Sequence, residues 1–398
     1  MTKTEKIFFS LIVLLPIIDI ITSFTTSLPL SFGALLRTGF MFFLFIFIVN
    51  YLRPTVNTLF LFSLPFLSIT LTFLINFVLK QPFYITEEIQ FVVKTAYFVV
   101  MIFSAFVFLE KRLVKKDVIL QGTAIASIIV GASYWIAILT KTDITSYTYV
   151  KAGYSGWFYS ANELSVIVII LLTLAIIHFH ASRSALSLVA FSFILTMTPM
   201  IGTKTAFYGA IIIILSYIVL IIFMKQIKQN LPLLAITVFS IFFLPLTPYM
   251  TNMTSVDSPV EKTKNTEQEM KQQLMSSRDI YLGEKKADYL QAPLIRKLFG
   301  LGYAGDYKKN PKMIEMDFFD LFFSYGVVGT FIILLPLPVL LNKLLIYRCT
   351  ISYFLLLLTL ALIGGIAFVA GHVMFAPAVM TYVAILVIII GLEARKTA

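Results

Sequence analysis

The chain is a succession of apolar runs of about 20 residues, and this pattern decides which folds are open to it. A helix of about 20 residues crosses the roughly 30 Å hydrocarbon core of a bilayer. Of the 398 residues, 59% are hydrophobic and only 13% are charged, whereas soluble domains carry about 25% charged residues. The sequence therefore predicts an all-α polytopic membrane protein.

We predict about twelve transmembrane helices within a single integral membrane domain that covers residues 1–398. The expected spans are residues 8–28, 32–50, 58–79, 90–109, 118–139, 162–178, 184–199, 205–224, 231–249, 318–341, 350–370 and 374–391. The run at 184–199 is the shortest, so a count of ten or eleven is also open. The first run lacks a small-residue cleavage site, which favours a retained helix over a signal peptide.

Basic residues in the short loops indicate an orientation, because cytoplasmic loops are enriched in Lys and Arg. With the N-terminus in the cytoplasm, every cytoplasmic segment carries at least one base; these segments are 1–7, 50–57, 110–117, 179–183, 225–230, 342–349 and 392–398. We therefore predict that both termini are cytoplasmic. The abundance of Phe, Ile and Lys points to a bacterial source, and hence to a bacterial plasma membrane. Residues 250–316 then form one large extracytoplasmic loop between two spans.

This long polar segment ends in a cluster of acids at the mouth of a span. Glu315 precedes the span, and Asp317, Asp320 and Ser324 follow at i, i+3, i+7 spacing, which places these three on one helical face. An Asp at mid-depth costs roughly 2.5–3.5 kcal/mol on insertion scales, so we expect this face to point into the protein or a wet cleft. Helix capping is one explanation for the acids. The other is general-base catalysis on an acceptor hydroxyl.

Basic residues inside spans on the predicted outer side oppose the usual charge bias. Arg37 and Lys94 are of this kind. One interpretation is internal ion pairing, of Arg37 with Asp19 and of Lys94 with Glu87 or Glu88. The other is an anionic ligand, for which a phosphate or pyrophosphate suits Arg through bidentate hydrogen bonds.

Two polar motifs open further spans on the same predicted side. The first, GWFYSANE at 156–163, places Asn162 and Glu163 after an aromatic cluster that suits a membrane interface or stacking against sugar rings. The second, GTKTA at 202–206, contains Lys204. It lacks the longer glycine pattern of a nucleotide P-loop and faces away from cytoplasmic ATP, which excludes an NTPase.

Metal and disulfide chemistry have little support in the sequence. Cys349 is the single cysteine, which excludes an intramolecular disulfide and a Cys-based metal cluster. His178 and His180 lie at the cytoplasmic edge, and His372 lies in a predicted outer turn where a structural role is the simpler interpretation. We predict no metal site and no nucleic-acid partner.

In order and spacing, these features resemble the O-antigen ligase and Wzy-type polysaccharide polymerase families of bacterial polysaccharide assembly. The resemblance rests on the motifs at 156–163 and 202–206, on Ser277-Arg278-Asp279, on LFGLG at 298–302 and on residues 315–329, arranged around one large external loop. It implies a glycosyltransferase fold of the C type (GT-C). In the ligases a His opens the motif at the end of the loop; this chain has Glu315 there. That acidic variant resembles Gram-positive polymerase-like members.

The resemblance also implies a function, a site and partners. We expect a polymerase that joins undecaprenyl-pyrophosphate-linked oligosaccharide repeat units into a surface polysaccharide, such as capsule or exopolysaccharide, on the outer leaflet. The implied roles are pyrophosphate binding by Arg278, Lys204 and Arg37, further substrate binding by Asn162, Glu163 and Asp320, and proton abstraction by Glu315 or Asp317. No cofactor is expected, because the activated bond arrives already made. The expected partners are the lipid-linked donor and acceptor, membrane lipids, a chain-length regulator and a flippase.

Two alternatives to a polymerase stay open. A ligase would use the same fold and chemistry to transfer the glycan to another acceptor. A transporter or flippase of lipid-linked glycans would also carry buried charges among many spans. The lack of a visible internal repeat and the long external segment argue against the transporter.

Overall fold

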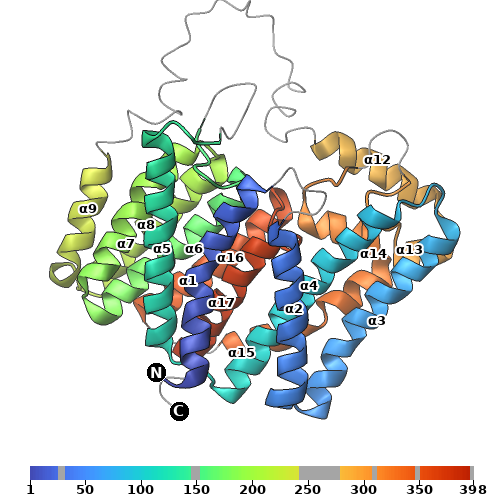
Figure 1. Ribbon diagram of the computed structural model, residues 1–398, viewed down its shortest axis with the longest axis horizontal. Coiled ribbons are helices and arrows are strands. Elements are labelled where there is room, and N and C mark those ends of the chain that lie inside the picture. Colours follow the sequence, from blue (N-terminus) through green and yellow to red (C-terminus); the bar gives the residue numbers. More distant parts are fainter. Residues whose placement is uncertain (26–31, 145–152, 242–277, 307–311, 346–349, 395–398) are drawn as a thin grey trace, which may run out of the picture.

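The described part of the chain, in a computed structural model, is a bundle of helices without strands. It comprises residues 1–25, 32–144, 153–241, 278–306, 312–345 and 350–394 (Figure 1). The first half contains α1 (Lys3–Phe24), α2 (Phe32–Phe47) with the π-turn η1 (Ile48–Leu52), α3 (Val56–Leu79), α4 (Ile85–Lys111), α5 (Lys116–Leu139), α6 (Ala161–Ser182) and α7 (Ala185–Met197) with η2 (Thr198–Ile201). There follow α8 (Lys204–Phe223), η3 (Lys228–Asn230), α9 (Leu231–Ile241), α12 (Arg278–Gln291), α13 (Leu294–Phe299), α14 (Asp317–Leu334), α15 (Pro336–Leu344), α16 (Ile351–Val369) and α17 (Pro377–Ala394).

Within these described residues, ten helical segments are long and apolar enough to cross a membrane, which confirms the all-α polytopic class. The prediction of about twelve spans differs from this count at two places. The run at 184–199 is realised as Ala185–Ile201, which is shorter than the other spans because its last turn tightens at Pro199 and the chain reverses at Gly202 (φ 76°). The run at 231–249 begins as α9, and its remainder lies outside the described residues.

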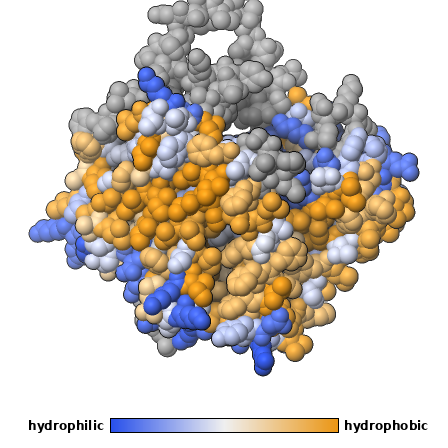
Figure 2. All heavy atoms as spheres, viewed as in Figure 1, coloured by the Kyte–Doolittle hydropathy of each residue, from blue (hydrophilic) through white to orange (hydrophobic). Residues whose placement is uncertain are grey.

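The surface agrees with a membrane setting. An apolar belt runs across the middle of the molecule between two more polar ends (Figure 2). Large side chains on the outer faces of the bundle, such as Phe60, Leu67 and Phe331, are exposed in that belt's helices. In contrast, α4, α6 and α17 are buried on nearly all sides and form the centre of the bundle. Their apolar composition on every side suits that position.

Both ends of the described chain lie at the same end of the bundle (Figure 1). A capping box of Thr2 and Glu5 starts α1. Glu393, near the end of α17, forms an ion pair of 2.5 Å with Lys116 at the start of α5. Chain ends on the same side are expected when a chain crosses the membrane an even number of times. The segments that carry the sequence motifs lie at the opposite end of the bundle.

Helix α14 is broken where the preceding chain folds back against it. Gly326 has non-helical angles (φ 69°, ψ −175°) in the middle of the helix. The freed carbonyls of Phe323 and Ser324 accept hydrogen bonds of 2.9 and 3.1 Å from the N–H groups of Leu301 and Gly302. Because a break within a span must find other hydrogen-bond partners, this segment completes the span. The longer described part of the predicted loop, residues 278–306, is thus docked on α14, residues 312–316 lead into that helix, and residues 250–277 and 307–311 lie outside the described residues.

Candidate active site at one end of the bundle

Glu315 and His372 face each other at the end of the bundle away from the termini. Glu315 stands just before α14, and His372 stands in the turn between α16 and α17. Their side chains approach to 3.7 Å between Oε2 and Nε2. Gly371 permits this approach, since a Cβ at that position would lie 2.6 Å from the carbonyl oxygen of Glu315. Both Glu315 (φ 64°) and His372 (φ 62°) adopt the left-handed backbone conformation that non-glycine residues rarely take.

The two aspartates of α14 hold the segments that carry this pair. One carboxylate oxygen of Asp317 accepts hydrogen bonds of 2.8 Å from the N–H groups of both Val373 and Met374. Asp320 likewise accepts from the N–H groups of Ile314 and Met316, at 2.8 and 3.1 Å. The aspartates therefore fix the backbone on either side of Glu315 and just after His372.

The predicted inward face of α14 is confirmed by burial. Asp317, Asp320 and Ser324 are exposed by only 2%, 4% and 4%. Their spacing along one helical face therefore does carry them into the protein rather than toward lipid.

Three further polar side chains surround the pair. Arg278, the first residue of α12, lies 3.7 Å from Glu315, and Lys312 lies 3.6 Å from its other carboxylate oxygen. Asn162 of α6 lies 3.3 Å from Nε2 of His372. The Nε of Arg278 is buried and has no hydrogen-bond partner within the described part of the chain. Since a guanidinium carries five N–H donors, Arg278 has donors left for an anionic ligand.

The contacts shift the pKa values of Glu315 and His372 in opposite directions. The pKa of Glu315 is lowered to about 2. The largest cause is its side-chain interaction with His372; the charges of Lys312 and Arg278 act in the same direction, and burial opposes them. Burial acts to lower the pKa of His372, but its contact with Glu315 and the charge of Glu163 outweigh burial, so the pKa is raised. The carboxylate is therefore ionised over the whole physiological range, and the imidazole titrates above its ordinary value.

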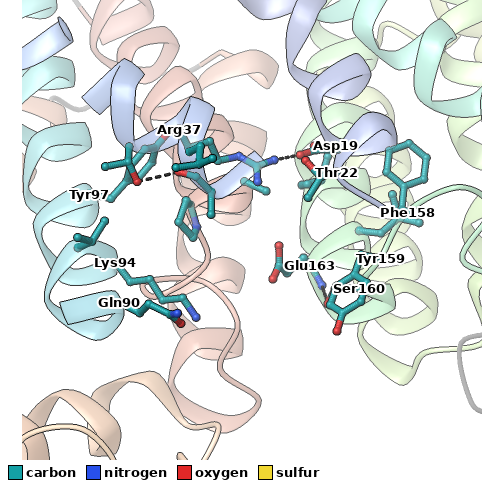
Figure 3. A pocket seen from close by; sticks show the side chains of 18 of the residues that line it. Asp19, Thr22, Arg37, Gln90, Lys94, Tyr97, Phe158, Tyr159, Ser160 and Glu163 are labelled. Atoms are coloured by element: carbon teal, nitrogen blue, oxygen red, sulfur yellow. Dashed lines mark hydrogen bonds and ion pairs between the residues drawn. The ribbon is translucent and has the colours of Figure 1, made fainter. Parts of the chain in front are cut away.

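A pocket of about 620 Å³ has Glu163 in its wall, the residue that follows Asn162 in α6 (Figure 3). Helices α1, α2, α4, α6 and α17 line it, together with the residues just before α6. Asp19 and Arg37 form an ion pair at its wall, as one interpretation of the sequence predicted. Lys94 and Glu163 project into the pocket from opposite sides (Figure 3).

The predicted pairing of Lys94 with Glu88 is wrong. Glu88 is buried and binds Lys80 at 2.5 Å, and the same carboxylate accepts a hydrogen bond of 2.9 Å from the N–H of Tyr303. Glu88 thereby fastens the segment that docks on α14. Within the described part of the chain, Lys94 makes no hydrogen bond or ion pair that would neutralise it.

The structure gathers most of the predicted site residues but not all of them. Asn162, Arg278, Glu315, Asp317 and Asp320 lie in or directly behind the cluster, and Glu163 lies in the pocket. Arg37 lies deeper, at the pocket wall. Lys204 is exposed at the start of α8 and contacts none of the cluster; the preceding Thr203 is tied to α6 by a 2.5 Å contact with Ser165.

His372 belongs to the cluster, although its position in the sequence favoured a structural role. Its segment carries no motif, and its importance comes from the fold, which brings it next to Glu315. Among the described residues, no group of three or more His, Cys, Asp or Glu side chains is arranged to hold a metal ion.

A bundle of membrane spans with an acid, a histidine and an arginine gathered at one end defines a polytopic membrane protein with a charged site at the mouth of the bundle. A family model described as O-antigen ligase like membrane protein matches residues 1–257 and 250–395, and the chain belongs to this family. Comparisons with curated proteins and with solved structures found no match. Family membership implies a glycosyltransferase-type activity that transfers a lipid-linked glycan.

Proposed function

We propose that the protein is a polymerase that joins undecaprenyl-pyrophosphate-linked oligosaccharide repeat units on the outer leaflet of a bacterial plasma membrane. The observation that carries this proposal is the meeting of Arg278, Glu315 and His372 at one mouth of the bundle. A cation for the leaving group and a proton acceptor for the attacking hydroxyl are what glycosyl transfer from a diphosphate requires. A chain-length regulator and a flippase are the partners we expect beside the lipid-linked substrates.

Arg278 is the proposed ligand of the donor pyrophosphate. Its guanidinium keeps unpaired donors, and Lys312 adds a second positive charge next to it. As the bond between the anomeric carbon and the phosphate oxygen breaks, negative charge grows on the leaving group, and prearranged cations stabilise it. Lys204 stands further away, and we propose for it a contact with a more distant part of the donor.

The proposed proton acceptor is the pair of Glu315 and His372 rather than a single carboxylate. A carboxylate with a pKa of about 2 is a weak base, and the most effective catalytic pKa lies near the working pH. The pKa of His372 lies closer to the working pH. Glu315 can keep the Nε2 of His372 protonated, so that the other ring nitrogen of His372 accepts the proton of the hydroxyl group. Asp317 then acts as a positioning residue through the turn that bears His372.

The proposed reaction is a single displacement. The acceptor hydroxyl oxygen bonds to the anomeric carbon while the carbon–oxygen bond to the pyrophosphate breaks. The hydroxyl proton passes to His372, and the lipid pyrophosphate leaves as an anion beside Arg278. Direct attack of this kind inverts the anomeric centre, because no second carboxylate forms a covalent intermediate.

The test is elongation of a lipid-linked repeat unit by the purified protein in nanodiscs. We expect a ladder of products, and we expect Arg278→Ala and Glu315→Gln each to lower its rate by about 100-fold or more. Lys286→Ala, which removes an exposed base of the same helix α12, is the matched control and should retain the ladder. Full elongation by both site variants would refute the proposed roles.

The same assay separates the alternatives. A single addition to a different acceptor, without a ladder, would indicate a ligase. Movement of the lipid-linked unit across the bilayer without any new glycosidic bond would indicate a transporter.

A further inference from the structure

One buried face of α4 meets three segments that converge at the mouth of the bundle. Glu88, Phe91 and Thr95 follow i, i+3, i+7 spacing, so they share this face of the helix. Their side chains are exposed by only 2%, 4% and 0%. A carboxylate and a hydroxyl are costly to bury unless they make hydrogen bonds. Their presence indicates that this face makes specific contacts and does not serve only as apolar packing.

The two polar residues of this face each fasten a different segment. Glu88 accepts a hydrogen bond of 2.9 Å from the N–H of Tyr303, in the segment that docks on α14. Thr95 accepts a hydrogen bond of 2.7 Å from the hydroxyl of Tyr325, which directly precedes the break in α14. The docked segment and the broken span are therefore fixed to the same helix, on either side of Phe91.

Phe91 lies between these two fastenings and contacts three aromatic rings. The ring centroids lie 5.8 Å from Tyr303, 5.6 Å from Tyr325 and 5.0 Å from Phe375. Aromatic rings attract each other at such separations. Phe375 belongs to the turn between α16 and α17 and follows His372 by three residues. One side chain of α4 thus contacts the docked segment, the broken span and the turn that carries His372.

The turn that carries His372 is fastened on two sides. Asp317 accepts hydrogen bonds from two consecutive N–H groups of the turn. Phe375 follows directly in the chain, and its half-buried ring lies against Phe91. Hydrogen bonds to two neighbouring N–H groups leave the turn free to tilt about them, whereas a packed ring opposes such a tilt. The 3.7 Å approach of His372 to Glu315 depends on that tilt.

We propose that Phe91 is a positioning residue for His372. Through Phe375 it sets the distance between His372 and Glu315, and through the two tyrosine rings it keeps the turn in register with the docked segment. Phe91 acts through these neighbours and touches no reacting group. Its effect on elongation rests on the proposed function, whereas its effect on the position of His372 does not.

The kinetic test replaces the ring with a smaller apolar side chain. Phe91→Leu should lower kcat for elongation by about 10- to 100-fold, because a small misplacement of a catalytic group has an effect of this size. KM should stay unchanged, since the groups proposed to bind substrate keep their places.

Phe106→Leu is the matched control. Phe106 lies on the same helix, is exposed by the same 4% and contacts the ring of Phe62 at 5.7 Å. It lies 15 residues from Phe91, or about 22 Å along the helix axis. Both variants should lower the thermal unfolding temperature by a similar amount, and only Phe91→Leu should lower kcat.

The charged groups around His372 decide what a displacement of the turn does to its pKa. Burial lowers this pKa, and three acids raise it, namely Glu315, Glu163 and Asp317. The cations Lys312 and Arg278 contact Glu315. A turn displaced from Glu315 loses the largest raising effect, so the pKa of His372 should fall toward its ordinary value of about 6.5.

Nuclear magnetic resonance measures this pKa without reference to elongation. The chain contains three histidines, so full-length protein in nanodiscs with ¹³C-labelled histidine gives three imidazole signals, and His372→Gln identifies one of them. We expect the titration of His372 to move to lower pH in Phe91→Leu and to stay in place in Phe106→Leu.

A second variant tests the route and covers the case in which Phe91→Leu does not fold. Phe375→Leu removes the partner ring in the turn and should reproduce both the loss of kcat and the shift of the titration. If Phe91 acts through Phe375, the double variant should lose no more kcat than the more affected single variant. Losses that multiply in the double variant would overturn this route.

Two further outcomes would overturn the positioning role. One is a wild-type titration of His372 in Phe91→Leu, and the other is an equal loss of kcat in Phe91→Leu and Phe106→Leu. Failure of the proposed function has a different signature. If the wild-type protein formed no ladder, the polymerase would be refuted, and the titration of His372 would still decide whether Phe91 positions it.

Discussion

Single residues at the mouth of the bundle are held in costly conformations. Glu315 and His372 both have a positive φ, and a non-glycine residue in that region costs about 1–3 kcal/mol. Such conformations persist where the surroundings determine them, and here Asp317 and Asp320 bind the flanking backbone N–H groups. Asp317 and Asp320 therefore hold the backbone around Glu315 and His372, and in the proposed mechanism Glu315 and His372 carry out the proton transfer.

The pair of Glu315 and His372 predicts a pH dependence. If neutral His372 accepts the proton, elongation should fall as the pH drops through its raised pKa. Glu315→Gln removes the carboxylate that raises this pKa, so the acid limb of the rate profile should move to lower pH while the maximum rate falls. The measurement is initial elongation rate against pH for both proteins. If the acid limb did not move, Glu315 would not be the group that raises the pKa of His372.

Asp317 is expected to matter for folding as well as for activity. Asp317→Ala would leave the buried N–H groups of Val373 and Met374 without their acceptor, at about 1–3 kcal/mol for each group. We expect lower thermal stability in detergent together with loss of elongation. A purely catalytic aspartate would lose activity without a change in the unfolding temperature, so an unchanged unfolding temperature would contradict the positioning role.

At the scale of elements, α14 depends on a segment that precedes it in the chain. Gly300 has a φ of 90°, and a Cβ there would overlap the carbonyl oxygen of Ser324. Gly326 has a φ of 69°, and its Cβ would lie 2.6 Å from the backbone of Leu298 and Gly300. Only glycine at both positions permits the segment to lie against the break in the helix.

A pair of glycine substitutions tests this dependence. Gly300→Ala should destabilise the protein by about 1–3 kcal/mol from backbone strain alone, with further loss from the overlap. Gly283→Ala, within α12 where a Cβ has open space, should be neutral or stabilise by up to about 1 kcal/mol. Thermal unfolding of the two proteins in the same detergent makes the comparison. Equal unfolding temperatures would show that the docked segment is dispensable.

The helices themselves were predictable from the sequence, whereas the contacts between them were not. Length and hydropathy predicted the spans, and the spacing of Asp317, Asp320 and Ser324 predicted their inward face. The partner of Glu88 was not predictable from helical spacing. Lys94 lies six residues from Glu88, which is too far for neighbours on a helix surface, and Lys80 reaches it only because the chain turns between α3 and α4.

The same limit applies to the site. Glu315 and Arg278 stand next to recognisable motifs, so the sequence could suggest them. The roles of His372 and of the break at Gly326 depend on contacts with segments distant in the chain, and no local sequence pattern predicts those contacts.

At the scale of the whole molecule, the proposal depends on which side of the membrane the cluster faces. The termini share one end of the bundle, and α12 lies at the other (Figure 1). Glu315 and His372 lie with α12, because Glu315 contacts both Arg278 of α12 and His372. The described basic segments, such as residues 110–117 and 179–183, lie between helix ends on the side of the termini, and from the charge bias we predict that this side is cytoplasmic. An outer-leaflet glycan would then meet the cluster directly.

Thiol labelling can test this orientation in intact cells. The sequence contains one cysteine, Cys349, so Cys349→Ser provides a background without thiols. Lys286→Cys on α12 and Lys225→Cys after α8 are both exposed and lie at opposite ends of the bundle. We expect a membrane-impermeant maleimide to label the first in intact cells and the second only after permeabilisation. The reverse pattern would turn the cluster toward the cytosol, where lipid-linked glycans of the outer leaflet cannot reach it, and the proposed polymerase would have to be abandoned.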